Sequence, residues 1–154
     1  QWQSGGRWGL SQAKTSWYNT DQKVVMSVKL GAIGVQKVTA KLLEQGFLVS
    51  TPIYDDGYDL ITDWRGNMCR VQVKCTSGNE DGRRRKLKFF AIRGPGFGHM
   101  KKRIYSKSDC DAFIFYHTGM DAVFILPRDK APKTQSIYIE PNSKWRDNWS
   151  VLKA

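Results

Sequence analysis

Acidic residues are scarce in this chain of 154 residues, which has 14 Asp and Glu against 25 Lys and Arg and a net charge of +11. The chain also lacks a run of about 18 apolar residues, the length that a membrane-spanning helix needs. Its first residues contain no apolar signal core. These absences favour a soluble domain whose partner is a polyanion, and nucleic acid is the usual one. An anionic membrane is the rival partner, but the sequence has no basic amphipathic helix or lipidation motif to support it.

Cysteine and histidine are too few, and too irregularly spaced, for the common disulfide and metal frameworks. Cys69, Cys75 and Cys110 are an odd number with no C-x-x-C spacing, which indicates neither a disulfide framework nor a zinc site. We therefore expect buried free thiols in a reducing compartment. His99 and His117 have no metal-binding spacing with these cysteines, so a histidine-based metal or catalytic site is disfavoured.

The length of the chain predicts one domain, large enough to bury roughly two-thirds of its unfolded surface. Residues 1–25 show neither a helical nor a strand period, and Met26 follows them as a candidate original start. We interpret residues 1–25 as an N-terminal arm, a loosely ordered extension, or an appended or upstream-encoded sequence. Residues 26–154 are the predicted globular domain.

Apolar spacing in the first part of this domain predicts one helix. Val35, Val38 and Leu42 recur at i, i+3 and i+7 within residues 27–45, and Gly46 follows as a C-terminal stop.

The remainder of the domain reads as strands separated by turn signals. Asp-Asp-Gly and Arg-Gly-Asn separate the first three strands, which predicts an antiparallel meander after the helix. Thr-Gly-Met-Asp joins the last two strands as a hairpin. The predicted strands cover residues 47–54, 58–64, 68–75, 87–93, 111–117 and 122–127.

A basic block lies between residues 83 and 107, with ten Lys or Arg and no acid. A solubilising surface is the plainer explanation, but such a concentration favours a phosphate-binding role. The first four of these residues would run along a groove, where Arg can pair with guanine. Those after the glycine-rich loop (94–98) would anchor the DNA backbone. The predicted DNA-binding residues are Arg83, Arg84, Arg85, Lys86, Lys88, Arg93, Lys101, Lys102 and Arg103.

The strand over 68–75 carries polar residues at alternate positions. Because successive side chains of a strand point to opposite faces, Gln72 and Lys74 share one face, while Val71, Val73 and Cys75 share the other. They follow Asp59 by 13 and 15 residues, and the neighbouring strand would bring that carboxylate to the same face. The alternative is an ordinary solvated sheet face.

The order of these motifs resembles the PD-(D/E)XK nuclease family. The residues that carry the resemblance are G-A-I-G and L-L-E-Q-G-F, then Y-D-L, V-Q-V-K and D-C-D-A-F-I-F-Y, within residues 27–128. The chain is most similar to the cyanobacterial group I intron homing endonucleases of this type (tRNA-intron type), in which Gln replaces the second acid. The resemblance implies an α/β fold with a restriction-endonuclease-like core, a mixed central sheet flanked by helices.

The resemblance also implies roles for the residues at the matching positions. Asp59 would bind a divalent cation, usually Mg²⁺, and Ca²⁺ would replace it without supporting cleavage. The Gln72 side-chain oxygen and the Val73 carbonyl would be neutral ligands of the same ion. Lys74 would hold the attacking water or stabilise charge at the phosphate.

The family also has a glutamate on the first helix, just after the glycines, where this chain has Val35 or Gln36. This leaves Asp59 as the only carboxylate, a poor site for a divalent ion. One interpretation is that Gln36 is a catalytic position at which glutamine replaces glutamate, so that DNA is bound without being cut. The other is that the acid lies elsewhere, for example at Glu44, or is absent.

Together these features predict a sequence-specific, divalent-metal-dependent double-strand DNA endonuclease that promotes intron homing in the bacterial cytoplasm. A chain of this length has a radius of gyration of about 15 Å, and cutting both strands needs two active sites. At least a dimer follows, and the resemblance implies a homotetramer. The alternatives are a Holliday-junction resolvase or restriction nuclease on the same fold, and a non-catalytic DNA-binding protein.

Overall fold

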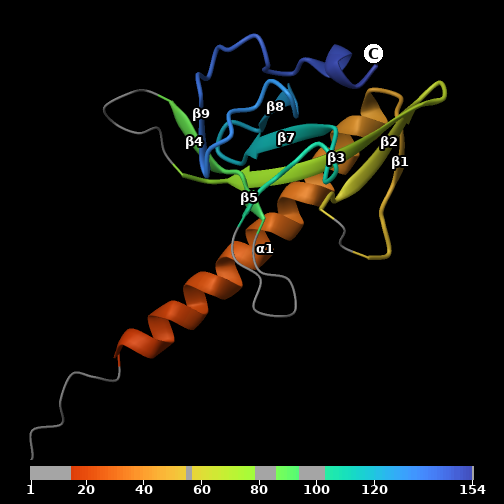
Figure 1. Cartoon of the computed structure of the whole chain (residues 1–154). Helices are drawn as coiled ribbons and strands as arrows, with labels where there is room; N and C mark the ends of the chain where they lie inside the picture. Colours follow the sequence, from red (N-terminus) through yellow and green to blue (C-terminus); the bar gives the residue numbers. More distant parts are fainter. Residues whose placement is uncertain (1–14, 55–56, 79–85, 94–102, 154) are drawn as a thin grey trace, which may run out of the picture.

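The core of the molecule is a mixed β-sheet of five strands (Figure 1). The computed structural model describes residues 15–54, 57–78, 86–93 and 103–153, with side chains from residue 28 onward. The strand order is β1-β2-β3-β7-β8, and all pairs are antiparallel except β3 and β7. The strands are β1 (Leu48–Ser50), β2 (Leu60–Trp64), β3 (Asn67–Thr76), β7 (Ala112–His117) and β8 (Ala122–Pro127). The predicted mixed sheet and its initial meander are confirmed.

Two short sheets and a 3-10 helix complete the described part. β4 (Leu87–Phe90) pairs with β9 (Ser136–Ile139), and β5 (Ile92–Arg93) pairs with β6 (Arg103–Ile104). The helix η2 (Trp149–Leu152) lies near the C-terminus. The strand predicted over 87–93 is thus two strands with different partners, joined at Ala91, whose N–H donates to Gln135 O at 2.9 Å and extends the β4–β9 pairing.

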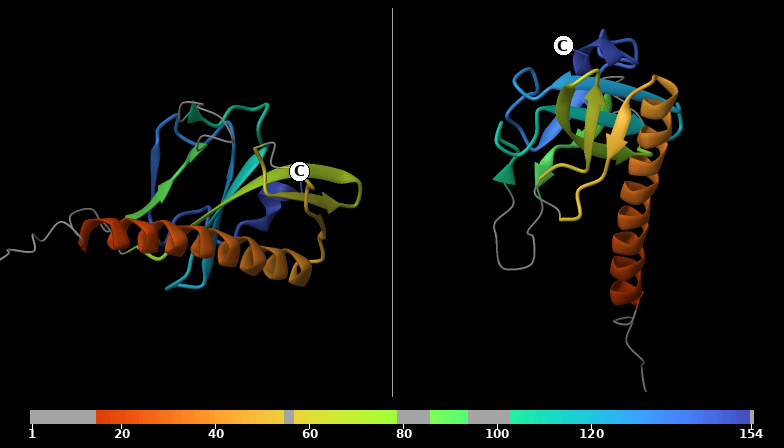
Figure 2. Two further views of the ribbon diagram at one scale, coloured as in Figure 1. Left: turned by 90° about the horizontal axis from the view of Figure 1, so that it is seen from below. Right: turned by 90° about the vertical axis from the view of Figure 1, so that its right-hand side faces the viewer.

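The long helix α1 (Thr15–Glu44) packs on one face of the sheet, and its N-terminal half extends beyond the strands (Figure 1, Figure 2). The prediction placed its start near residue 27, so the helix begins twelve residues earlier, within the segment interpreted as an arm. Its end agrees with the prediction, because Gly46 adopts φ 83°. Phe47 N–H donates to Leu42 O at 3.1 Å and Gly46 N–H to Leu43 O at 2.9 Å, the two bonds of a Schellman cap. No helix in the described ranges is both long and apolar enough to cross a membrane.

The turn between β2 and β3 matches the sequence prediction closely. Trp64 pairs with Asn67 across a two-residue loop in which Arg65 has φ 54° and Gly66 has φ 94°. Two positive φ angles are the type I′ geometry that suits the twist of a hairpin, and glycine at the second position favours it. This turn fixes the register of the two strands that carry the candidate site. The first strand is shorter than predicted, and Pro52, which has no N–H to donate to a ladder, follows its end.

The two faces of the sheet bury different clusters of apolar side chains. On the α1 side, Val38 and Leu42 pack with Leu60, Val71 and Ile114. The opposite face packs against the β4–β9 sheet, and its buried side chains include Leu87, Phe89, Phe113, Phe115, Phe124 and Ile137. All six residues of β7 are buried, so this central strand contributes to both clusters.

Candidate functional site

The polar face of β3 is enclosed. Gln72 is only 5% exposed and Lys74 is half-buried, while Val71 and Val73 contribute to the α1 side of the sheet. The alternation predicted for this strand is therefore confirmed, and a solvated sheet face is excluded. A buried amide and a half-buried ammonium need polar partners, and the structure supplies them.

Asp59 lies just before β2 and joins the β3 residues through its carboxylate. Its Oδ2 accepts hydrogen bonds from Val73 N–H at 2.9 Å and from Gln72 Nε2 at 2.5 Å. Its own N–H donates to Val71 O at 2.9 Å, which fixes the backbone beside the next strand. The structure thus brings Asp59 and Gln72 together across the hairpin, as the spacing predicted.

Lys74 is oriented by a partner that the sequence analysis missed. Its Nζ donates to the Tyr105 hydroxyl at 2.9 Å and to Ile92 O at 3.4 Å, and it lies 4.8 Å from the centroid of the Tyr105 ring. Tyr105 is itself buried, so its hydroxyl is a fixed point for the ammonium. A tyrosine 31 residues away gives no local signal of this contact, although Tyr105 lies inside the basic block that the sequence singled out.

The first-helix positions differ in where they face. Gly34, Val38 and Leu42 are buried against the sheet, and Val35 is half-buried and packs on the same cluster. Gln36 follows Gly34 by two residues, about 200° around a helix of 3.6 residues per turn, and it is exposed on the opposite side. The structure does not bring Gln36 to the Asp59 group, and its catalytic role stays a prediction. Val35 is the one of the two positions that faces the sheet.

The donor atoms at this site fit a hard divalent cation in kind but supply little charge. The Asp59 carboxylate, the Gln72 amide and the Val73 carbonyl are oxygen donors of the type that Mg²⁺ and Ca²⁺ take. No group of three or more His, Cys, Asp or Glu that could hold a metal occurs in the described ranges. The Gln72 Nε2 donates to both Asp59 Oδ2 and Val73 O, the latter at 3.1 Å. The amide nitrogen therefore faces the Asp59 and Val73 oxygens, and turning the amide over would present the Gln72 oxygen on that side instead.

Four of the predicted DNA-binding residues lie in the described ranges, and three of them pair with carboxylates. Lys86 pairs with Glu140 at 3.0 Å. Arg93 and Arg103 both pair with Asp109, at 2.9 and 2.5 Å. Lys88 lies over the rings of Phe90 and Tyr138 and forms no ion pair with a described residue. The other predicted DNA-binding residues, Arg83, Arg84, Arg85, Lys101 and Lys102, lie outside the described residues.

Asp109 is the centre of a compact network beside the site. It is 3% exposed, and its carboxylate accepts bonds from Arg93, Arg103 and both the N–H and hydroxyl of Ser106. The hydrogen bonds from Arg103 and then from Ser106 hold the pKa of Asp109 well below its usual range, against the opposing effect of burial. Arg93 and Arg103 therefore form ion pairs with an acid inside the protein. The sequence predicted only DNA binding for these two arginines.

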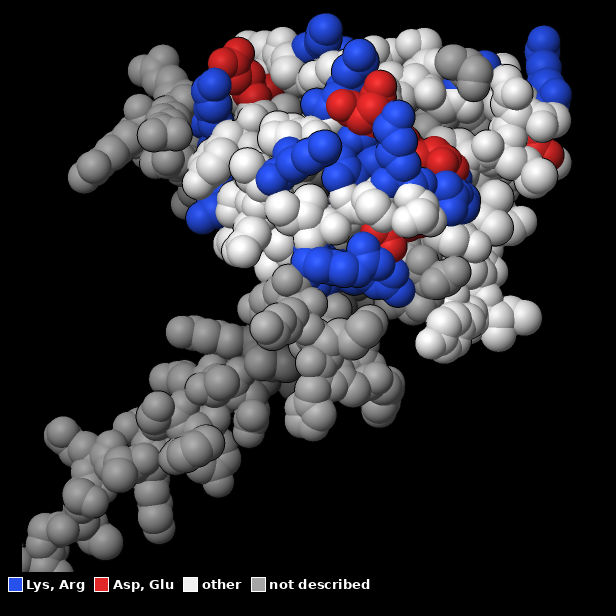
Figure 3. Space-filling model, in the orientation of Figure 1, with Lys and Arg blue, Asp and Glu red and all other residues white. Residues whose placement is uncertain are grey.

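Cationic side chains nevertheless gather on one face of the molecule. On the face seen in Figure 3, Lys and Arg side chains cover the middle of the domain, with a few Asp and Glu among them. The three cysteines are free, as predicted, and only Cys110 is fully buried. Burial raises the pKa of the Cys69 and Cys75 thiols to about 11, so neither is a reactive thiolate at neutral pH.

Comparisons with known proteins agree with this architecture. A family model described as PD-(D/E)XK endonuclease matches residues 25–152. Among solved structures, the bacterial homing endonuclease I-Ssp6803I matches with a TM-score of 0.67 and 20% sequence identity, over 82% of this chain and 93% of that chain. The predicted restriction-endonuclease-like fold is thereby confirmed. No curated protein matches the chain.

Proposed function

The chain belongs to the PD-(D/E)XK endonuclease family, and on that premise we propose that it is a divalent-metal-dependent nuclease that hydrolyses phosphodiester bonds of double-stranded DNA. The observation that carries this proposal is the contact of the Asp59 carboxylate with Gln72 and Val73 of β3, the strand that also carries Lys74. The same chain has a net charge of +11, which suits a polyanionic substrate. The more specific proposal is a sequence-specific homing endonuclease of the bacterial cytoplasm that promotes intron homing and acts as a homotetramer.

The residues of the site have separate tasks in the proposed reaction. Water attacks the scissile phosphorus in line with the leaving oxygen, so that one P–O bond forms as the other breaks. Lys74 donates a hydrogen bond to a phosphate oxygen and stabilises the charge that develops there. The Tyr105 hydroxyl, 2.9 Å from the ammonium, keeps Lys74 in this orientation.

Asp59, Gln72 and the Val73 carbonyl would hold the divalent cation, which would supply Lewis-acid stabilisation of negative charge. For this, the Gln72 amide turns over, because its nitrogen now donates to both neighbouring oxygens. Mg²⁺ is the proposed ion for cleavage, and Ca²⁺ would bind without supporting it. Calorimetry of Ca²⁺ binding tests the cation site independently of cleavage. The matched variant Asp59→Asn should abolish this Ca²⁺ binding.

The cleavage test compares the unmodified chain with Val35→Glu and Gln36→Glu. Each is incubated with Mg²⁺ or Ca²⁺ and a library of random-sequence duplexes, and the cut ends are sequenced. Cuts at one long duplex sequence, dependent on Mg²⁺ and lost in Lys74→Met, support the homing proposal. Preference for four-way junctions over linear duplex selects the resolvase alternative. Val35 faces the sheet and Gln36 does not. A gain of cleavage in Gln36→Glu but not in Val35→Glu would therefore contradict the orientation of these two residues on α1.

One observation favours a second candidate function, a DNA-binding protein without catalysis. Among the described residues that we assign to the site, Asp59 is the single carboxylate, and the Gln72 amide presents a donor to it. If the chain and both glutamate variants bind duplex DNA but never cut it, this second function replaces the first. If about eight phosphates are contacted in either case, the slope of log affinity against log salt should be near −7.

A further inference from the structure

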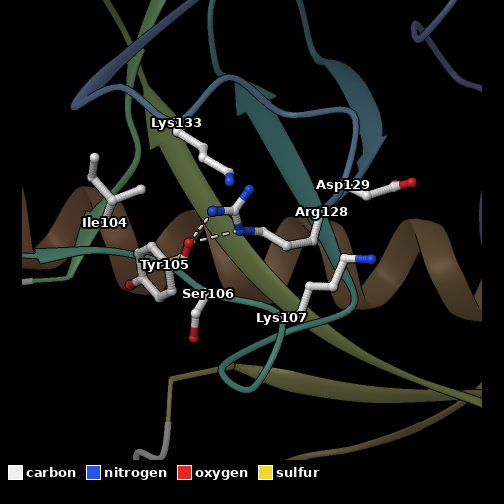
Figure 4. A pocket seen from close by; sticks show the side chains of 7 residues that line it. All are labelled: Ile104, Tyr105, Ser106, Lys107, Arg128, Asp129 and Lys133. Atoms are coloured by element: carbon white, nitrogen blue, oxygen red, sulfur yellow. Dashed lines mark hydrogen bonds between the residues drawn. The ribbon is translucent and has the colours of Figure 1, made fainter.

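A cavity of about 470 Å³ is lined in part by Tyr105 (Figure 4), the residue whose hydroxyl accepts a hydrogen bond from Lys74. Its walls come from the segment after β6 and from the segment after β8, which are distant in sequence. Ile104 and Tyr105 contribute to its apolar wall, and three cations, Arg128, Lys107 and Lys133, contribute to its polar wall. This volume is within the range of about 300–1,000 Å³ for small-molecule sites.

Arg128 is a buried cation with backbone partners and no carboxylate. It is 6% exposed, and its Nε and Nη2 both donate to Tyr105 O, while Nη1 donates to Ala131 O at 3.5 Å. It forms no ion pair in the described part of the chain. A guanidinium has five N–H groups, so these three bonds leave two to spare (five less three). Buried charges are ordinarily paired, which makes an anion in the cavity the natural partner for this one.

The other charges of the cavity add to the same potential. Lys107 and Lys133 are exposed, and neither forms an ion pair with a described residue. Figure 4 shows Lys133 directed toward the Arg128 guanidinium, while Asp129, the sole acid of the lining, points away from it. Three cations against one acid is an arrangement that binds a phosphate group.

We propose that this cavity binds the phosphate of a nucleotide, held by Arg128 at the back and by Lys107 and Lys133 at the entrance. The apolar wall beside them accommodates the attached sugar or base. Tyr105 connects the cavity to the candidate site, since its carbonyl accepts from Arg128 and its hydroxyl from Lys74. Successive phosphates of one strand advance about 3.4 Å along the helix axis, so a strand phosphate here lies within a few nucleotides of the scissile bond. That last position rests on the proposed function, but the phosphate site itself does not.

The test uses two charge-matched double variants of the full chain. Lys107→Gln/Lys133→Gln removes the two cavity ammoniums, and the control Lys130→Gln/Lys144→Gln removes two exposed ammoniums that do not line the cavity. The probes are adenosine 5′-monophosphate, adenosine, inorganic phosphate, and a duplex without terminal phosphates. Binding is measured by calorimetry and by fluorescence polarisation over a salt series. Arg128→Lys is a further variant, used only if its thermal unfolding matches that of the unmodified chain.

The cavity variant should bind phosphate-bearing probes about tenfold more weakly than the control, with a salt slope on duplex shallower by about 2. If the cavity variant binds the duplex more weakly than the control variant does, the cavity holds a phosphodiester of a DNA strand. If only its binding of the mononucleotide is weaker, the cavity holds a terminal phosphate. Equal affinities of the two double variants for every probe would overturn the proposal. Asp59→Asn should keep full phosphate binding, so a chain that never cuts DNA still allows the cavity to be tested.

Discussion

Two aspartates, Asp109 and Asp59, show how differently one side chain is used within this fold. Asp109 is almost fully buried and accepts bonds from two arginines and from Ser106. Asp59 is half-buried, and it accepts hydrogen bonds from the Val73 N–H and the Gln72 amide of β3. The first carboxylate is neutralised by charged donors inside the protein. The second is positioned in the hairpin by neutral donors, the Val73 N–H and the Gln72 amide, which hold its Oδ2.

Removing the charge of Asp109 is the strongest way to test this comparison. Asp109→Asn should lower the free energy of unfolding by about 2–3 kcal/mol, because it weakens the charged hydrogen bonds that a buried carboxylate accepts from Arg93 and Arg103. Denaturant unfolding measures the change. The exposed Asp129, whose nearest cation is Lys130 at 3.9 Å, is the control: Asp129→Asn should change stability by less than about 0.5 kcal/mol. Similar losses in the free energy of unfolding for both variants would show that the ion pairs of Asp109 with Arg93 and Arg103 do not stabilise the fold.

The pH dependence of stability should include a contribution from Asp109, beside those of Asp111 and Asp121, whose pKa values are also lowered. The folded pKa of Asp109 is depressed, so this residue stabilises the fold fully above the unfolded value of about 3.9 and loses that contribution as pH falls through it toward the folded pKa. We expect roughly 2 kcal/mol of such loss below pH 4. The difference in unfolding free energy between the unmodified chain and Asp109→Asn should be largest at pH 6 and should shrink steadily toward pH 2. A difference that stays constant with pH would contradict the assignment.

Gln72→Glu tests whether Asp59 and residue 72 together form a cation site. It places a second carboxylate against Asp59, and without metal the repulsion should cost about 1–2 kcal/mol of stability. Ca²⁺ should reverse this loss, because the ion binds the two carboxylates together, and its affinity should rise at least tenfold. Thermal unfolding with and without Ca²⁺ separates the effects. If Ca²⁺ leaves the variant as unstable as before, the pair is not a cation site.

Asp59→Asn should have a smaller effect on stability than Asp109→Asn or Gln72→Glu, below about 1 kcal/mol. An asparagine oxygen can still accept from Val73 N–H and from the Gln72 amide, so the hairpin contacts persist. Ca²⁺ binding, in contrast, should be lost. A loss of stability comparable to that of Asp109→Asn would mean that Asp59 is a structural residue.

The features that sequence predicted well are those fixed by nearby residues. The alternation of side-chain direction along β3 follows from the pleat of a strand. The turn at Arg65 and Gly66 and the end of α1 at Gly46 both follow from the ease with which glycine adopts a positive φ angle. Each depends on interactions across a few residues, which periodicity and turn chemistry can show. The approach of Asp59 to Gln72 followed from the hairpin in the same way.

The features that sequence missed depend on distant or competing partners. Tyr105 reaches Lys74 only because the segment after β6 packs across the sheet, and no local pattern encodes that. Arg103 was assigned to DNA because the basic block was read without Asp109, six residues later. The S-x-x-D spacing of Ser106 and Asp109 resembles a capping box. This spacing was the available signal that the Asp109 carboxylate accepts hydrogen bonds from Ser106, three residues earlier.

The parallel pairing of β3 with β7 also has a consequence for how the protein folds. Trp64 and Asn67 are three residues apart, whereas Val71 and Ala112 are 41 apart (112 − 71). Closing the longer loop costs about 2 kcal/mol more in chain entropy, and such non-local pairing is slow. We therefore expect the hairpin with Asp59 and Gln72 to form early, and Lys74 to acquire Tyr105 only when β7 docks. The chain would pass through a partly folded state that has its carboxylate in place before its lysine is held.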